Sequence, residues 1–345
     1  MAFLIPVRTI IFEFMSVLNI DKINLGLIIV SFLLACMLPF ELFLFSYAVL
    51  GPLHYLTETN WIIDKKYFVA NNYWKYLVLF GALVYSIPYI VSLPFVKNIL
   101  NETAVQLLTV KLSNYTNGIM FFVFINALVF LFTNKNKALW ISLFITLIVS
   151  VFTLTSDIYT LINGLLLPTI IHVYLFTILF MIYGMQKTKN KIGKLNVCLM
   201  ILLPLLLICI DTDIFSYHFS DTVKEIYVQN NFHYLNANLS KMLGVYDDLK
   251  FFFYEKIDLK IQIFIAFVYI YHYLNWFSKT TIIGWHKQLT TKKSIVIIVV
   301  WVSILICYLY SYRLGLVVSI FLSVIHVMLE FPLNMITIKA LFNHK

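Results

Sequence analysis

Residues 294–312 read SIVIIVVWVSILICYLYSY, a stretch without a single charged side chain. As a helix with a rise of about 1.5 Å per residue, these residues match the hydrocarbon core of a bilayer, which is roughly 30 Å thick. Similar apolar runs recur along the whole chain of 345 residues. The sequence therefore predicts an all-α, polytopic integral membrane helical bundle.

The composition supports the same fold class. Hydrophobic residues make up 61% of the chain and charged residues 12%, against about 25% charged residues in an ordinary soluble domain. This composition excludes a soluble globular enzyme, a nucleic-acid-binding domain and a disordered chain. The net charge of +9 therefore points to membrane topology and not to a nucleic-acid partner.

The apolar runs predict about ten transmembrane helices. Their expected residues are 24–38, 40–62, 75–96, 117–132, 138–156, 158–184, 195–215, 261–284, 294–312 and 314–337. With the N-terminus inside, 17 Lys and Arg fall in cytoplasmic segments and 8 in outer segments. This asymmetry obeys the positive-inside rule, so we expect both termini to be cytoplasmic and the membrane to be a bacterial inner membrane.

The whole chain, residues 1–345, is expected to form one transmembrane domain. Residues 97–116 and 216–260 are polar enough to be extracytoplasmic loops, and their partly amphipathic patterns suit a membrane surface. The sequence does not indicate an oligomeric state.

Four histidines lie inside predicted helices, where ionisable side chains are costly and face the bundle interior. They are His54, His172, His272 and His326. All four helices run from outside to inside, and the four positions along them differ by about 5 Å at the helical rise. Four imidazoles at one level are typical of a shared metal centre, since the ligands must converge on the ion.

Two carboxylates and one amide accompany these histidines. Glu58 follows His54 by four residues, Glu330 follows His326 by four, and Asn275 lies one turn beyond His272. Residues four apart share a helix face. Each Glu can therefore be a ligand, orient a histidine ligand or move protons, and Asn275 can hydrogen-bond a bound ligand or offer a weak oxygen ligand.

Other readings of the histidines stay open. Neutral His and protonated Glu side chains could form a proton or solute pathway through the helices, or the histidines could serve packing alone. Haem held by two axial pairs is a third reading, but stacked haems need pairs at two depths and these histidines share one level.

Three segments resemble a known family. Gly51-Pro-Leu-His54-Tyr-Leu-Thr-Glu58 is similar to the Gly-(Leu/Pro)-His-x-x-x-Asp motif of the Brp/Blh family of membrane carotene dioxygenases. Phe267-Val-Tyr-Ile-Tyr-His272-Tyr-Leu-Asn-Trp276 resembles its aromatic-rich His-x-x-x-His helix, and Val324-Ile-His326-Val-Met-Leu-Glu330 its C-terminal His-Met-aliphatic-acidic helix. The segments occur in the same order and cover about 30 of the 345 residues.

The resemblance implies an all-helical membrane fold, a histidine-bound iron and oxidative cleavage of a polyene by O2. On it, His54, His272 and His326 fall on the family's histidines. Trp276 stands where the family has a second histidine, and we infer that His172 supplies the missing ligand.

These observations predict a membrane non-haem iron oxygenase that acts with O2 on an apolar lipid or a polyene such as a carotenoid. Fe2+ fits imidazole and carboxylate ligands, and zinc or copper would also fit. One alternative is a proton-coupled transporter that uses the His/Glu cluster as a relay. Another is a lipid-linked transferase that binds a divalent metal through Asp211 and Asp213.

Overall fold

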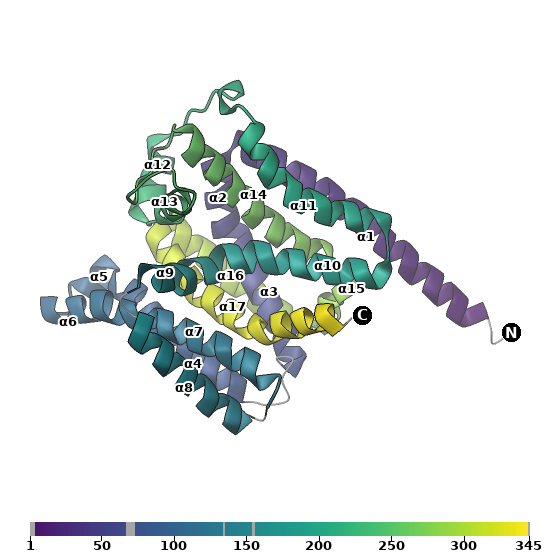
Figure 1. Cartoon of the computed structure of the whole chain (residues 1–345), viewed down its shortest axis with the longest axis horizontal. Coiled ribbons are helices and arrows are strands. Elements are labelled where there is room, and N and C mark those ends of the chain that lie inside the picture. Colours follow the sequence, from purple (N-terminus) through teal and green to yellow (C-terminus); the bar gives the residue numbers. More distant parts are fainter. Residues whose placement is uncertain (1–3, 67–72, 134, 154–155, 344–345) are drawn as a thin grey trace. The chain divides into compact units, whose positions relative to one another are not determined.

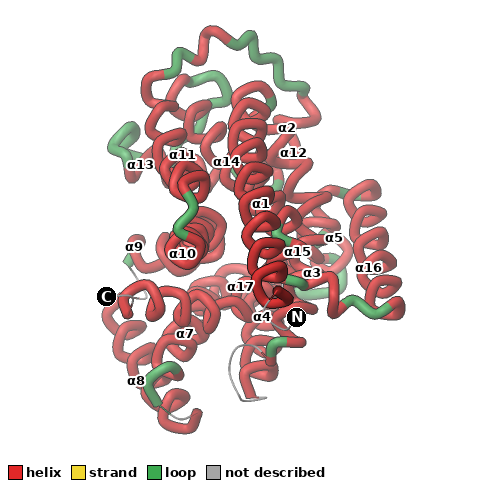
Figure 2. The backbone as a smooth tube through the Cα atoms, turned by 90° about the vertical axis from the view of Figure 1, so that its right-hand side faces the viewer, coloured by secondary structure: helices red, strands yellow, loops and turns green. Residues whose placement is uncertain are grey.

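The computed structural model describes residues 4–66, 73–133, 135–153 and 156–343. These residues form helices joined by short loops, and no strand occurs among them (Figure 2). The predicted all-α fold is confirmed. Eight of the described helices are long and apolar enough to cross a bilayer, so the chain is a polytopic membrane protein.

These eight helical segments coincide with eight of the ten predicted runs. They are Ile20–Met37, Tyr73–Val91, Glu102–Phe130, Ile158–Thr188, Lys191–Cys209, Lys256–Ser278, Thr291–Tyr310 and Tyr312–Asn343. The two remaining runs are also helical, 40–62 throughout and 138–156 as far as Thr153, while residues 154–155 lie outside the described residues. The run 40–62 contains Glu41 and Glu58. In the run 138–156, the apolar helix that could be assessed covers Asn136–Val149. A count of ten therefore stays a prediction.

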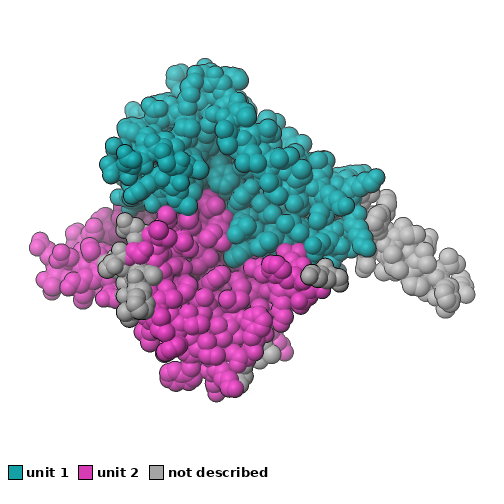
Figure 3. All heavy atoms as spheres, in the orientation of Figure 1, with its two compact units in different colours: residues 1–50, 173–287 teal, residues 51–172, 288–345 magenta. Residues whose placement is uncertain are grey.

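The chain packs as two compact units, and each unit draws on two separate stretches of sequence (Figure 3). Unit 1 contains residues 1–50 and 173–287, and unit 2 contains residues 51–172 and 288–345.

Unit 1 is built around α14 (Lys256–Ser278), which packs against α1 (Leu4–Met37), α2 (Pro39–Phe45) and α11 (Lys191–Cys209). The remaining helices of this unit are shorter (Figure 1). They are η1 (Ser46–Leu50), α10 (Thr177–Thr188), η5 (Thr212–Ile214), α12 (Asp221–Gln229), α13 (His233–Met242), α15 (Thr280–Ile283) and η6 (Trp285–Gln288). The separation predicted between the runs 24–38 and 40–62 is present, because α1 ends at Met37 and α2 begins at Pro39.

A buried carboxylate orders the polar segment 216–260 of unit 1. Asp258, fully buried at the start of α14, accepts hydrogen bonds from Ser240 Oγ (2.7 Å), the backbone N–H of Phe252 (2.7 Å) and Tyr246 Oη (3.2 Å). Three donors compensate the carboxylate for its lost hydration. These three hydrogen bonds hold the loop after α13 against the N-terminal end of α14, so the polar segment 216–260 packs on that helix.

Unit 2 is built around α17 (Tyr312–Asn343), which packs against α3 (Gly51–Asp64), α4 (Tyr73–Val91), α7 (Leu112–Phe130) and α16 (Thr291–Tyr310). Its other helices are α5 (Pro94–Lys97), α6 (Glu102–Gln106), η3 (Leu107–Lys111), α8 (Lys135–Thr153) and α9 (Asp157–Thr160). The π-helix η4 (Leu161–Phe176) follows α9, and its last residues, 173–176, belong to unit 1. Residues 102–130 are helical throughout, so the second half of the predicted loop 97–116 continues directly into α7.

Small residues allow the helices of unit 2 to approach closely, as in other membrane proteins. A Cβ atom on Gly81 of α4 would lie 3.3 Å from Met328 Sδ of α17. A Cβ atom on Gly315 of α17 would lie 2.3 Å from the ring of Tyr308, near the end of α16. The turn between α16 and α17 therefore depends on the missing side chain of Gly315.

We expect Gly315→Ala to destabilise the protein by about 1–3 kcal/mol, because the added methyl group must displace an aromatic ring from a packed position. The free energy of unfolding in detergent micelles measures this effect. Gly184→Ala in α10 is the matched control, since no atom lies within 4 Å of that Cβ position. Equal stability of the two variants would contradict the packing described for this turn.

Candidate metal centre

A histidine and a glutamate on α3 form the first part of the site. The π-helical turn η1 ends at Leu50, and Gly51 and Pro52 open α3. His54 Nε2 lies 3.1 Å from Glu58 Oε2, one turn further along the same helix. The contact predicted from the four-residue spacing is therefore present.

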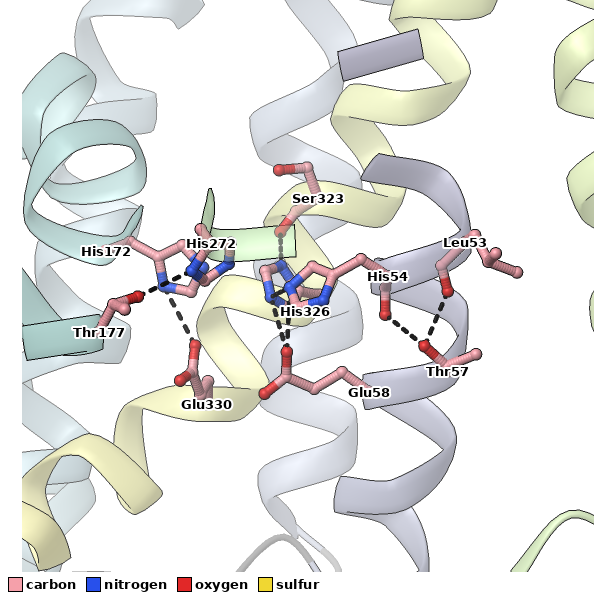
Figure 4. A network of polar contacts seen from close by, with 10 residues as sticks. All are labelled: Leu53, His54, Thr57, Glu58, His172, Thr177, His272, Ser323, His326 and Glu330. Carbon is pink, nitrogen blue, oxygen red and sulfur yellow. Dashed lines mark hydrogen bonds and ion pairs between the residues drawn. The ribbon is translucent and has the colours of Figure 1, made fainter. Parts of the chain in front are cut away.

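His326 of α17 completes a triangle with this pair. Its Nε2 lies 3.2 Å from His54 Nε2 and 3.3 Å from Glu58 Oε2. Figure 4 shows the three side chains pointing toward one another. We refer to the three atoms, His54 Nε2, His326 Nε2 and Glu58 Oε2, as the donor triangle. All three residues are at most 4% exposed, so bulk water does not reach them.

The donor triangle fits a single metal ion. Imidazole nitrogens and carboxylate oxygens bind first-row metals at about 2.0–2.2 Å, so two neighbouring ligands of one ion lie about 3.0–3.4 Å apart. The three edges of the triangle, 3.1, 3.2 and 3.3 Å, fall in this range.

Hydrogen bonding alone explains the triangle less well. Each ring nitrogen offers one lone pair or one proton, in one direction, whereas His54 Nε2 and His326 Nε2 each have two polar neighbours within 3.3 Å. One bound ion would use one lone pair of each of the three atoms. The residues present therefore fit a metal, and the same set could also move protons.

A second His–Glu pair lies beside the triangle. His172, on η4, has its Nδ1 3.1 Å from Glu330 Oε2 of α17. The ring of His172 is 4.7 Å from that of His326, at an interplanar angle of 83°. His172, His326 and Glu330 each offer a ligand atom within 4.8 Å of the other two, and all three are buried. Five of the predicted site residues are thus brought together within unit 2.

The charge of this cluster requires a partner. Among the described residues, the ion pairs of Glu58 and Glu330 are with histidines, and no Lys or Arg side chain pairs with either carboxylate. A buried carboxylate without a counter-charge is strongly disfavoured. A bound cation or a pair of protons must supply that charge.

The other two predicted site residues lie in unit 1, on α14. His272 Nδ1 is 2.9 Å from Thr177 Oγ1 of α10. Tyr271 Oη donates to Asn275 Oδ1 at 3.4 Å, and Ser278 Oγ donates to the backbone carbonyl oxygen of Asn275 at 2.9 Å. Both side chains are buried and hydrogen-bonded within their own unit. Their roles as ligand and ligand-binding residue stay predictions.

Sequence reasoning missed one residue at the site. The ring of Tyr55 lies 4.9 Å from the ring of His326, inclined by 31°, so it packs on the face of a donor-triangle imidazole. Tyr55 follows His54 directly, but no spacing rule relates it to a residue on α17.

The two aspartates considered for transferase chemistry are already paired. Asp211 Oδ1 lies 3.1 Å from Lys256 Nζ, which also binds Asp213 Oδ2. The backbone N–H of Asp213 and the ammonium of Lys256 lower the pKa of Asp211 below its ordinary value. This arrangement joins the N-terminus of α14 to the turn after α11, which accounts for both carboxylates.

Searches of family models, curated proteins and solved structures found no match to the chain. The resemblance to the membrane carotene dioxygenases therefore stays a prediction that rests on the three motifs.

We expect the double substitution of Asp211→Asn and Asp213→Asn to leave Fe2+ binding at the wild-type level, because both carboxylates are exposed and already paired with Lys256 within unit 1. Binding of Fe2+ to the purified variant, measured by metal analysis under anaerobic conditions, checks this. Loss of the bound metal in this variant would contradict this expectation and assign the metal site to the two aspartates after α11.

Proposed function

We propose that the chain is an integral membrane oxygenase that uses non-haem iron and O2 on an apolar lipid or polyene substrate. The observation that carries this proposal is the donor triangle itself. Two imidazoles and one carboxylate on one face of an ion, with the other positions open, are typical of non-haem Fe(II) oxygenases. When bound there, iron would supply the one-electron chemistry that O2 activation requires.

The residues of unit 2 perform the remaining tasks. His54 and His326 would hold the ion as neutral imidazoles, and Glu58 would contribute one negative charge. The rigid positions of these residues on α3 and α17 hold the ligand atoms in place before the ion arrives. Burial of the site excludes bulk water, which protects a reactive centre from side reactions.

The surroundings support an apolar substrate. Two of the three helices that form the site, η4 and α17, belong to segments apolar and long enough to cross a bilayer, so a substrate dissolved in the bilayer need not cross water to reach it. The resemblance to carotene dioxygenases favours a polyene. Cleavage of one carbon–carbon double bond by one O2 gives two carbonyl groups and balances without an external reductant.

The metal assignment is tested by metal analysis of the purified protein after anaerobic reconstitution with Fe2+. We expect about one iron per chain in the wild type, and loss of that iron in His54→Ala, His326→Ala and Glu58→Ala, because each change removes one corner of the donor triangle. His218→Ala is the matched control, since His218 is exposed on the loop before α12 and should not affect iron binding.

A wild-type protein without stoichiometric transition metal would contradict the oxygenase proposal. If the same metal-free protein, in liposomes, carried a solute at a rate that changed near the ordinary histidine pKa of about 6.5, the proton-coupled transporter would replace it.

The reaction class is tested with all-trans β-carotene in detergent as the probe. We expect the iron-loaded protein to consume one O2 for each polyene cleaved, with no added reductant, and the His54→Ala protein to consume none. An oxygen electrode together with product analysis by mass spectrometry measures both quantities. Oxygen uptake that requires a reductant would exclude dioxygenase cleavage of this probe.

A further inference from the structure

The two glutamates of unit 2 occupy different positions relative to the histidines. Glu58 Oε2 faces two Nε2 atoms, at 3.1 and 3.3 Å, and is itself a corner of the donor triangle. Glu330 Oε2 faces one Nδ1 atom, that of His172, at 3.1 Å. The two glutamates therefore have different surroundings, although each follows a histidine by four residues on its helix.

Glu330 contacts one of the two ring nitrogens of His172. Its Oε2 lies 3.1 Å from His172 Nδ1, so a bound ion would be held by the other ring nitrogen, Nε2. On His326, likewise, Nδ1 lies 3.3 Å from the backbone carbonyl oxygen of Ser323, while Nε2 belongs to the donor triangle. Histidines that bind metals commonly donate their second N–H to a carboxylate or a carbonyl in this way.

We propose that Glu330 is a positioning residue that turns His172 Nε2 into a further ligand of the ion held by the donor triangle. The proposal rests on the proposed function, since it presupposes that ion. The ring of His172 is 4.7 Å from the ring of His326, close enough for both imidazoles to serve one centre. Glu330 acts through His172 and does not touch the ion.

The charge of the cluster fits one divalent ion. With both carboxylates ionised and the imidazoles neutral, the cluster carries a charge of −2, and among the described residues the ion pairs of both carboxylates are with histidines. One divalent cation makes the cluster neutral, which a site remote from water favours. A second divalent cation would leave an excess charge of +2 in the same apolar surroundings.

A double-mutant cycle in the full-length protein tests this role. The dissociation constant of Fe2+, measured anaerobically, is compared for the wild type, Glu330→Ala, His172→Ala and the double variant. Loss of an outer carboxylate partner typically weakens metal binding about 10- to 100-fold, and we expect this loss for Glu330→Ala. In the His172→Ala background the Glu330→Ala change should have no further effect, because its only route to the ion is already removed.

The spectrum of bound Co2+ gives a second readout, since its ligand-field bands report the number and geometry of the ligands. We expect Glu330→Ala and His172→Ala to show the same altered spectrum, and Glu330→Gln, which keeps an acceptor oxygen, to restore most of the wild-type spectrum. Asn334→Ala is the matched control. Asn334 is equally buried one turn further along α17, and its replacement should leave the spectrum unchanged.

Equal losses of Fe2+ affinity from Glu330→Ala in both backgrounds would overturn the proposal and make Glu330 a ligand in its own right. Two Fe2+ bound per wild-type chain would also overturn it, in favour of a dinuclear centre. Each of these results leaves the oxygenase proposal standing, whereas absence of any bound metal in the wild type contradicts the oxygenase proposal itself.

Discussion

The burial of two carboxylates among histidines inside apolar helices is the constraint on which this molecule depends. Glu58 and Glu330 are each 4% exposed, and within the described residues their ion-pair partners are imidazoles. Such a cluster is stable only when a cation or protons neutralise it. The convergence of two Nε2 atoms and one carboxylate oxygen favours a metal ion, because one ion uses all three lone pairs at once.

Helix packing in unit 2 builds this cluster from three separate parts of the chain. Helix α3 contributes His54 with Glu58, η4 contributes His172, and α17 contributes His326 with Glu330. Because α17 packs against α3, α4, α7 and α16, its central position allows one helix to serve both His–Glu contacts. Gly81 and Gly315 permit the close helix approach that holds α17 there.

Local spacing made part of this site predictable. The apolar runs indicate the helices, and the four-residue interval predicts the contact between His54 and Glu58. The same interval relates Glu330 to His326, yet Glu330 contacts His172, which is 158 positions away in sequence. That contact depends on how η4 packs against α17, and no periodicity within a single helix contains this information. The ring contact of Tyr55 with His326 could not be predicted from the sequence for the same reason. Nor could the division of the chain into two units.

The most direct test of the account is an experimental structure of the iron-loaded protein with anomalous scattering data collected at the iron absorption edge. The account predicts one anomalous peak per chain, about 2.0–2.2 Å from each atom of the donor triangle, with His172 Nε2 turned toward the same peak. An anomalous peak elsewhere in the chain, or the absence of any peak from protein soaked in Fe2+, would contradict it.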